Sequence, residues 1–179
     1  MRTIADHILD IAQNSVNAGA KEIEIKIKED DTKFEFEIID DGCGMDETVL
    51  SKVFDPFFTT KGKKTGLGLP LLKEYAELTG GYVKIESRKG MGTKIKVEFK
   101  KTIDCQPIGD LAGTLATLVL SSNARWHIER SFKDRSYIFS SEDINGDLTN
   151  PKNMKIIFEY FKRLEDSING RKSGSYDRS

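Results

Sequence analysis

The stretch from Thr59 to Pro70, TTKGKKTGLGLP, combines glycines, hydroxyls and lysines directly before an apolar helical pattern. Glycine-rich turns that lead into a helix expose backbone amides, and such amides bind phosphate. Two common phosphate sites do not fit this stretch. A P-loop needs a glycine at the position of Phe57 and a hydroxyl at that of Lys64, and a dinucleotide-binding fingerprint needs a glycine at Leu71. The stretch therefore predicts a phosphate site of another kind.

A second pair of polar residues lies near the N-terminus. Asp10 and Asn14 are four residues apart in an expected helix, so their side chains share one face. The carboxylate could accept a proton from water, and the amide oxygen could coordinate a hard cation. Taken alone, such a pair is more often two solvated side chains on an outer face.

A third polar group follows an expected strand. Asp40 ends this strand and is followed by Asp41-Gly42-Cys43-Gly44-Met45. A carboxylate at this place can accept a hydrogen bond from the exocyclic amine of adenine, while glycines let the backbone pass close to the ring. Gly92 and Thr93 open a later strand, and the hydroxyl could reach the same base. Each motif also has an ordinary explanation, since Asp-Gly and Gly-Thr pairs are frequent in tight turns.

Hydrophobic periodicity predicts the elements that carry these residues. The first hundred residues alternate between helices and hairpins, in the order helix 3–17, strands 21–30 and 33–40, helix 67–78, and strands 82–87 and 93–100. Residues 46–65 have no clean period and contain the aromatic cluster FDPFF, so we expect a long, partly mobile loop there.

This order predicts an α+β fold, a two-layer α/β sandwich with helices on one face of a mixed, mainly antiparallel sheet. The opposite face of the sheet is rich in Lys and Glu and should be exposed to solvent. After Lys101 the pattern becomes a short helix, a hairpin and a final helix that ends near Ile168. We therefore divide the chain into a domain of residues 1–101, a small C-terminal α/β extension of residues 102–168 with helix-hairpin-helix order, and a disordered tail of residues 169–179.

Composition excludes several classes of protein. The chain has 28 Lys and Arg against 29 Asp and Glu, a balance that gives no reason to expect nucleic acid or an anionic membrane as partner. Cys43 and Cys105 are too few for a disulfide framework and have no metal-ligand spacing with His7 or His127, so both are expected to be reduced and structural. Without a signal-peptide core or a membrane-length apolar run, the sequence predicts a soluble cytoplasmic protein.

Five segments together resemble a known superfamily. In order and spacing, DIAQNSVNAGA, DDGCGM, FDPFFTTK, TGLGL and GMGT resemble the N box, the first glycine box, the F box and the second and third glycine boxes of the GHKL superfamily, which includes gyrase, a class of heat-shock chaperones, histidine kinases and MutL. FDPFFTTK with GLGL is most similar to the histidine kinase catalytic domain, whereas NSVNAGA is closer to MutL. The resemblance covers the first hundred residues and implies the Bergerat ATP-binding fold, with TTKGKKTGLGLP as a lid over a magnesium-bound triphosphate.

The resemblance also implies roles for individual residues. Asn14 would be the magnesium ligand, and Asp10 stands where many members have a general-base Glu, although its side chain is one methylene shorter. Asp40 would read adenine with help from Thr93. The implied contacts to the purine come from Gly42 and Gly44, and those to the phosphates from Lys61, Gly66 and Gly68. The remaining residues that we predict in the ATP site are Met45, Phe57, Thr60, Leu67 and Leu69.

Three functions are compatible with the sequence. The first is a protein kinase that transfers the γ-phosphoryl of Mg-ATP to a His or Ser of a partner protein in trans, because the N box begins close to Met1 and leaves no room for the phosphoacceptor hairpin of histidine kinases. His7, inside the N-box helix, and His127, in a strand pattern, are expected to be structural. The second is an ATP-gated interaction module without transfer, and the third is a weak MutL-type ATPase in which Asp10 activates water.

The last expected helix has an apolar stripe formed by Met154, Ile157, Phe161, Leu164 and Ile168. Such a stripe is expected to pack back on its own chain. Phe158 and Tyr160 add aromatic surface beside Phe161, which leaves a homodimer contact through the C-terminal extension as the alternative.

Overall fold

The computed structural model describes residues 2–58, 68–144 and 146–170. The elements in chain order are α1 (Ile4–Asn17), β1 (Glu22–Glu29), β2 (Lys33–Asp40), α2 (Glu47–Lys52), α3 (Gly68–Leu78), β3 (Tyr82–Arg88), β4 (Gly92–Lys100), α4 (Leu111–Ser121), β5 (Arg125–Phe132), β6 (Arg135–Ser140) and α5 (Met154–Ile168). Short 3-10 turns cover Ser141–Asp143 and Pro151–Asn153. The predictions for Thr60, Lys61, Gly66 and Leu67, and those for the tail from residue 171 onward, lie outside the described residues.

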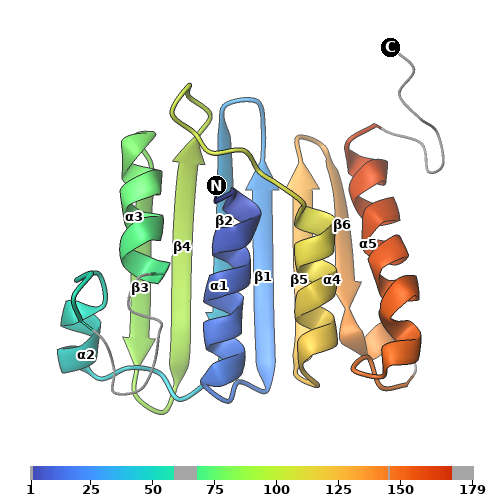
Figure 1. Cartoon of the computed structure of the whole chain (residues 1–179), viewed down its shortest axis with the longest axis horizontal. Helices are drawn as coiled ribbons and strands as arrows, with labels where there is room; N and C mark the ends of the chain where they lie inside the picture. The colour runs from blue at the N-terminus through green and yellow to red at the C-terminus, as the bar shows by residue number, and fades with distance from the viewer. Residues whose placement is uncertain (1, 59–67, 145, 171–179) are drawn as a thin grey trace.

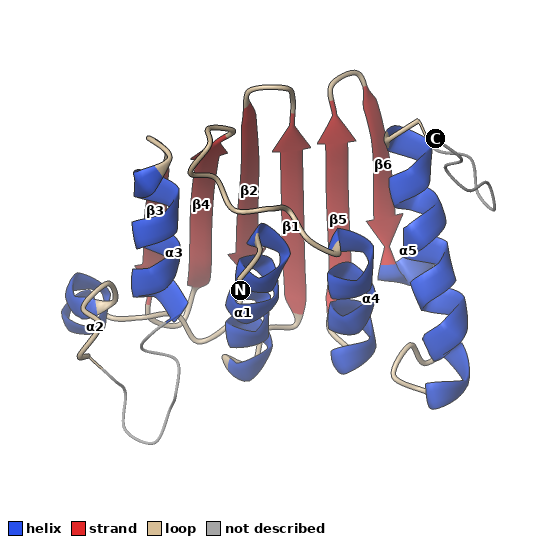
Figure 2. Cartoon of the chain, turned by 45° about the horizontal axis from the view of Figure 1, so that its top comes forward, coloured by secondary structure: helices blue, strands red, loops and turns tan. Residues whose placement is uncertain are grey.

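One six-stranded sheet in the order β3-β4-β2-β1-β5-β6 forms the back layer. Its neighbouring strands are antiparallel, except that β1 and β5 run parallel. The helices α1, α3, α4 and α5 lie together on one face of this sheet (Figures 1 and 2). The predicted α+β two-layer sandwich is therefore confirmed.

Alternating side chains separate the two faces of the sheet. Ile23, Ile25 and Ile27 on β1 are fully buried toward the helices, and the alternating residues of β2 and β4 are buried in the same way. Charged side chains alternate with them on the open face, where Lys33 lies 3.0 Å from Glu35 across an ion pair. Successive side chains of a β-strand point to opposite faces of the sheet. A strand with one buried face therefore alternates apolar and polar residues, and this alternation allowed the strands to be predicted from the sequence.

The segment after β2 differs from our expectation. Within the predicted loop of residues 46–65, the described part contains α2, a helix of six residues that starts at the N-cap Asp46, whose Oδ1 accepts a hydrogen bond of 2.8 Å from the Val49 amide. None of the α2 residues is buried. A helix this short and this exposed produces no hydrophobic period that a sequence pattern could reveal.

The C-terminal part continues the same sheet. Strand β5 pairs in parallel with β1 over its whole length, from Glu22 opposite Arg125 to Glu29 opposite Phe132, and β6 adds the edge. The helix α5 packs back on the chain through Ile157, Phe161 and Ile168 of its predicted stripe, and the Phe161 ring centroid lies 4.8 Å from that of Phe139 on β6. Met154, also predicted in the stripe, is 52% exposed, because it begins the helix beyond the edge of the core. The boundary at residue 101 and a homodimer contact through this region stay predictions.

A buried group of polar residues, which we call the Arg130 network, joins α5 to the sheet. The Arg130 guanidinium on β5 donates to Glu29 on β1 at 2.7 Å and to Glu165 on α5 at 3.1 Å. Tyr137 donates to Glu165 at 2.6 Å, and Lys101 donates to Glu29 at 2.5 Å. Burial, together with the Glu165 carboxylate, raises the pKa of Tyr137, so its hydroxyl remains a donor. Every member is thus paired, as buried charges require.

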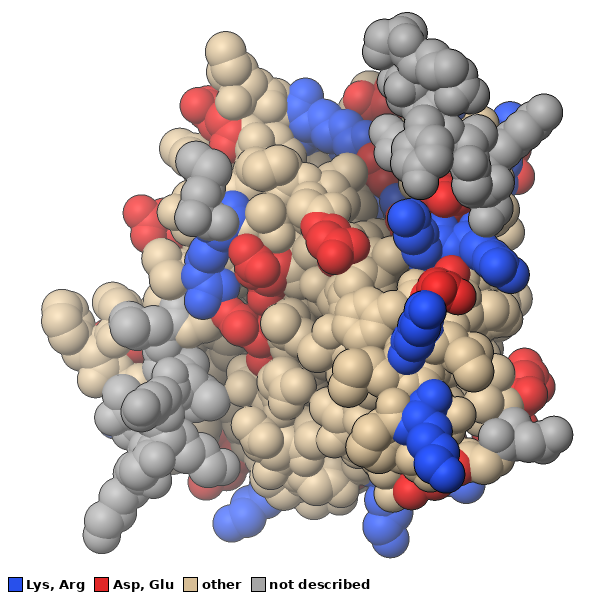
Figure 3. All heavy atoms as spheres, turned by 45° about the vertical axis from the view of Figure 1, so that its right-hand side comes forward, with Lys and Arg blue, Asp and Glu red and all other residues tan. Residues whose placement is uncertain are grey.

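The surface of the described part carries no large field of one sign on the face that Figure 3 presents, where basic and acidic side chains are interspersed with uncharged ones. This agrees with the nearly equal numbers of basic and acidic residues in the chain. Among the described residues, no helix combines the length and the apolar character needed to span a membrane.

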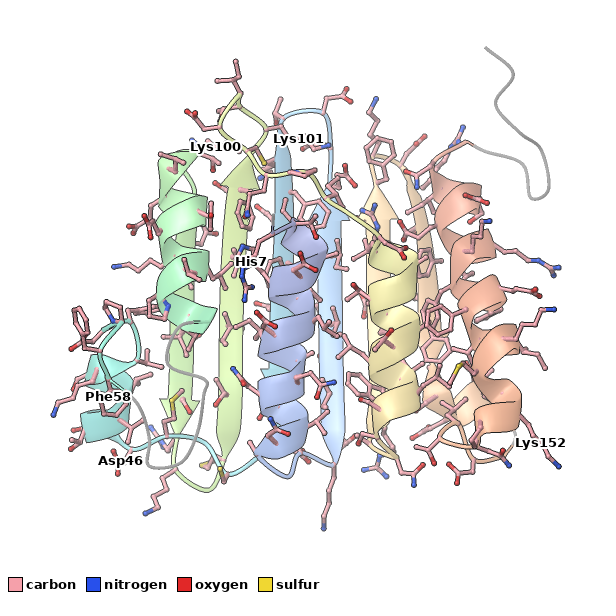
Figure 4. All side chains as sticks on the ribbon, viewed as in Figure 1. His7, Asp46, Phe58, Lys100, Lys101 and Lys152 are labelled. Atoms are coloured by element: carbon pink, nitrogen blue, oxygen red, sulfur yellow. The ribbon has the colours of Figure 1, made fainter. Side chains whose placement is uncertain are left out.

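His7 is buried between α1 and the sheet, with 1% of its surface exposed (Figure 4). Its Nε2 lies 2.8 Å from Gln106 Oε1, and its ring faces those of Tyr75 and Phe99. Burial is the largest influence on the pKa of His7 and lowers it below the ordinary value. Folding therefore favours the neutral form of the His7 ring.

This burial predicts a pH-dependent stability. Below a pH of about 6.5 the unfolded chain protonates His7 before the folded chain does, so the free energy of unfolding should fall as the pH drops from 7 to 5. In His7→Phe, which retains an aromatic ring, part of this decline should disappear in denaturant titrations across that range. His127→Gln, which removes the other histidine, is the control. An equally steep decline in His7→Phe and in the unmodified protein would contradict this assignment.

Candidate functional site

A cavity of about 750 Å3 opens between the last turns of α1, the end of β2, α2 and the start of α3. These parts of the chain lie at the lower left of Figure 1. This volume is within the range of roughly 300–1,000 Å3 that is usual for small-molecule sites. The wall combines apolar side chains with a few polar ones, contributed by Ile11, Asn14, Ser15, Asn17, Ala18, Asp40, Cys43, Gly44, Met45, Asp46, Val49, Val53, Phe58, Leu69, Ile85, Lys89, Thr93 and Ile95.

Asp40, the last residue of β2, is a polar anchor in this wall. Its Oδ2 accepts a hydrogen bond of 2.5 Å from the Ser15 hydroxyl, and its Oδ1 accepts one of 2.9 Å from the Gly42 amide. A carboxylate offers about four acceptor positions. Two positions therefore remain for a donor from a ligand, on a side chain that α1 and the following turn already hold in place.

Glycines let the segments around Asp40 approach each other closely. Gly44 and Gly92 both have positive φ angles, of 67° and 103°. A Cβ on Gly44 would collide with the Arg88 carbonyl oxygen, and one on Gly92 with the Asp40 carbonyl oxygen. Both glycines are therefore required by contacts within the protein. Of the two glycines predicted beneath a purine, Gly44 lines the cavity and Gly42 does not, and that role stays a prediction.

The last turns of α1 contribute Asn14 to the cavity wall, together with Ser15 and Asn17. Asp10 lies one turn earlier and is absent from the wall. Its Oδ2 instead pairs with Arg2 Nη1 at 2.5 Å, and both side chains are partly exposed. The structure thus brings Asn14, but not Asp10, to the cavity together with Asp40, and the general-base role of Asp10 stays a prediction.

Of the other predicted residues, Met45, Leu69 and Thr93 line the cavity. Phe57 is 92% exposed and lies outside the wall, whereas its neighbour Phe58 lines it (Figure 4). Gly68 begins α3 without joining the wall. An aromatic pair with no period gives no indication of which ring turns inward, so the sequence could not distinguish them.

Several wall residues were not predicted. Ile85 and Ile95 sit on inward-facing positions of β3 and β4, which the strand alternation of β4 could have indicated. Lys89 comes from the β3–β4 turn and is the one Lys or Arg among the wall residues that the structure describes. Nothing in the local sequence distinguishes this lysine from other turn lysines.

The polar side chains of the wall are of the types that suit a purine nucleotide with a bound magnesium ion. Asn14 supplies an amide oxygen, a ligand type suited to a hard cation. Asp40 and Thr93 supply oxygen atoms beside apolar side chains such as Ile95 and Leu69, the combination that an amine-bearing aromatic base requires.

Another cluster of potential metal ligands lies on the open face of the sheet. Glu24, His127 and Glu129 have ligand atoms within 4.8 Å of one another. However, Lys26 Nζ is 3.9 Å from the Glu24 carboxylate, and His127 Nε2 is 2.9 Å from the Glu129 carboxylate. The cluster is therefore already a network of paired polar side chains on a partly exposed surface.

Comparison with known proteins shows which proteins this chain is similar to. Residues 2–103 match the family model described as histidine kinase-, DNA gyrase B- and HSP90-like ATPase. Similar proteins include the sensor kinase CckA of Brucella abortus, 44% identical over 38% of this chain, the signal transduction histidine-protein kinase AtoS of Escherichia coli, 38% identical over 48%, and the sensor histidine kinase CitA of Klebsiella pneumoniae, 35% identical over 57%. The chain spans only 8%, 14% and 19% of the length of these three relatives.

The fold resembles solved structures as well. A crystal structure of the N-terminal domain of a DNA repair protein superimposes with a TM-score of 0.59 at 15% sequence identity, covering 86% of this chain and 56% of that one. This likeness concerns the fold alone, and it extends beyond the residues that the family model matches. Since the family model covers more than half of the chain, the chain belongs to the histidine kinase-, DNA gyrase B- and HSP90-like ATPase family and carries an ATP-binding domain of this type.

Proposed function

We propose that this protein binds Mg-ATP in the cavity and transfers the γ-phosphoryl group to a partner protein in trans. The observation that carries the proposal is that Asp40 and Asn14 line one cavity of about 750 Å3, at the ends of a strand and a helix. A base anchored at Asp40 would direct its phosphates toward the last turn of α1, where Asn14 lies.

In this proposal each side chain has one task. Asp40, oriented by Ser15 and Gly42, accepts the hydrogen bond of the adenine amine. Asn14 would hold Mg2+, which when bound would supply neutralisation of the phosphate charge. Lys61, the last residue of FDPFFTTK, and Gly66, the first residue of GLGL, would complete the phosphate contacts, because phosphoryl transfer depends mainly on positioning and electrostatic stabilisation.

The positions of the two histidines argue against either of them as the phosphoryl acceptor. His7 is buried against Gln106, Tyr75 and Phe99. His127 alternates with the buried Trp126 and Ile128 on β5, so it faces the open side of the sheet, away from the helices that enclose the cavity. A histidine that receives the phosphoryl group would therefore lie outside these 179 residues.

The proposal predicts a labelled partner. Incubation of the protein with γ-labelled ATP, magnesium and a cell extract of its source should label a second protein. Asn14→Ala should reduce the labelling at least about tenfold, because the metal contributes several kcal/mol to charge stabilisation. Asn123→Ala, an exposed asparagine between α4 and β5, is the matched control and should label normally.

The other outcomes identify the alternatives. Release of free phosphate without a labelled protein would indicate an ATPase. Bound ATP that stays intact, with no label on any protein, would indicate an ATP-gated interaction module and would contradict phosphoryl transfer. The position of Asp10 outside the cavity wall, where it pairs with Arg2, weighs against the ATPase, since a general base must lie within hydrogen-bond reach of the water that attacks the nucleotide.

A further inference from the structure

The parallel strands β1 and β5 carry three potential metal ligands on the open face of the sheet. Glu24 on β1 is the cross-strand partner of His127 on β5, and Glu129 follows His127 by two residues on the same face. His127 Nε2 lies 2.9 Å from a Glu129 carboxylate oxygen and 4.0 Å from a Glu24 carboxylate oxygen. The three ligand atoms all lie within 4.8 Å of one another. The two strands thus bring an imidazole and two carboxylates to one point.

The spacing of these three atoms is close to what a single metal ion requires. Nitrogen and oxygen ligands of zinc lie about 2.0–2.2 Å from the ion, so two of them in a tetrahedral site are roughly 3.4 Å apart. The two distances from His127 Nε2, 2.9 and 4.0 Å, fall on either side of this value. Small rotations of the two glutamate side chains would therefore place all three atoms around one ion, while the paired strands stay where they are.

The pairs that these side chains already form leave room for an ion. The three side chains are between 33% and 44% exposed, so an ion can enter from solvent and water can complete its coordination. Among the described residues, Lys26 is the one lysine or arginine that pairs with either carboxylate, and its Nζ is 3.9 Å from Glu24. One ammonium leaves the two carboxylates with excess negative charge. The neutral ring of His127 can carry its proton on Nδ1, which leaves the Nε2 lone pair for a metal.

The types of these ligands favour zinc over the hard divalent cations. Imidazole suits Zn2+, whereas Mg2+ and Ca2+ take oxygen ligands. Zinc sites with three protein ligands keep a fourth position for water, and a partly exposed surface supplies that water. The cluster should therefore discriminate against Mg2+, the ion that we propose for Asn14.

We propose that Glu24, His127 and Glu129 form a zinc site that links β1 to β5. Strand β1 belongs to residues 2–103, which the family model matches, whereas β5 follows them in the chain. An ion bound to both strands would hold the C-terminal segment to the matched part of the chain, in addition to the backbone hydrogen bonds of the parallel pair. None of the three ligands belongs to the cavity wall, so the zinc site does not depend on ATP binding there.

Calorimetric titration with zinc chloride, on protein freed of any histidine tag, tests this site. His127→Gln and Glu24→Gln should each lower the zinc affinity at least about tenfold, because loss of even an outer-shell partner of a metal ligand costs roughly 10- to 100-fold. Lys26→Met should raise the affinity about threefold or more, because it removes a cation that competes with the ion. Glu142→Gln, which changes an exposed glutamate outside the cluster, is the matched control and should bind zinc normally.

Thermal unfolding gives an independent measurement of the same site. Zinc at about 100 times its dissociation constant should raise the Tm by roughly 5–10 °C, since an ion that binds only the folded state stabilises it. This increase should disappear in His127→Gln. If that variant does not fold, Glu24→Gln provides the same comparison. Unchanged zinc affinity in the ligand variants, or magnesium bound by the cluster as tightly as zinc, would overturn the proposal.

Discussion

Arg130→Met is expected to lower the free energy of unfolding by about 3–5 kcal/mol, the usual cost of removing one partner from a buried ion pair. Arg130 is 2% exposed and holds Glu29 and Glu165 at 2.7 and 3.1 Å. Without the guanidinium, the Glu165 carboxylate on α5 would keep only the Tyr137 hydroxyl as a strong donor. Methionine fills a similar volume, so the loss would come from the uncompensated charge and not from a cavity.

Thermal unfolding followed by circular dichroism measures this effect. For a chain of this size each kcal/mol corresponds to about 2–4 °C in Tm, so a decrease of roughly 6–20 °C is expected. Arg125→Met is the control on the same strand, since Arg125 pairs with Glu22 and Glu142 while its side chain is 59% exposed. Exposed pairs contribute about 0–1 kcal/mol. Equal decreases of Tm in the two variants would show that the buried ion pairs of Arg130 contribute no more to stability than the exposed pairs of Arg125.

Asp40→Asn is expected to weaken ATP binding by about 10- to 150-fold, because hydrogen bonds to a charged group contribute roughly 1.5–3 kcal/mol and each 1.4 kcal/mol is a factor of ten. The carboxylate accepts from Ser15 and Gly42 at the same time as it would accept from the ligand. An amide has one acceptor oxygen, and its NH2 group would face a donor. The substitution therefore disturbs both the anchor and its support.

Calorimetric titration with Mg-ATP is the measurement, with Asp41→Asn as the matched control. Asp41 is the next residue, but its Oδ1 accepts from the backbone amides of Lys21 and Glu22 outside the cavity wall. An asparagine there can retain an oxygen acceptor, so ATP affinity should stay within about threefold of the unmodified protein. Unchanged affinity in Asp40→Asn would remove Asp40 from the site.

Local patterns predicted most of the first hundred residues. The strict alternation of β1, β2 and β4 identified the buried Ile and Phe side chains, and the helical spacing in α1 placed Asn14 near its C-terminal end. Six predicted site residues line the cavity: Asn14, Asp40, Gly44, Met45, Leu69 and Thr93. They could be predicted because they belong to short motifs at the ends of helices and strands, and such motifs can be recognised in the local sequence.

Other features depend on contacts between distant segments, which a local pattern does not record. The Arg130 network joins residues from β1, β5, β6 and α5, and no spacing rule connects Glu29 with Glu165. The parallel pairing of β5 with β1 was missed for the same reason. The pairing of Asp10 with Arg2, outside the cavity wall, is likewise a contact that the spacing of Asp10 and Asn14 does not indicate.

The parallel pairing of β1 with β5 also bears on how the chain folds during its synthesis. Strand β1 can join β2 as soon as both have left the ribosome, but its other edge stays open until residues 125–132 have been made. Open strand edges invite pairing with other chains, and long-range parallel contacts form slowly. A nascent chain that stalls before β5 is therefore expected to expose an unpaired edge on β1, at which pairing with other chains could begin.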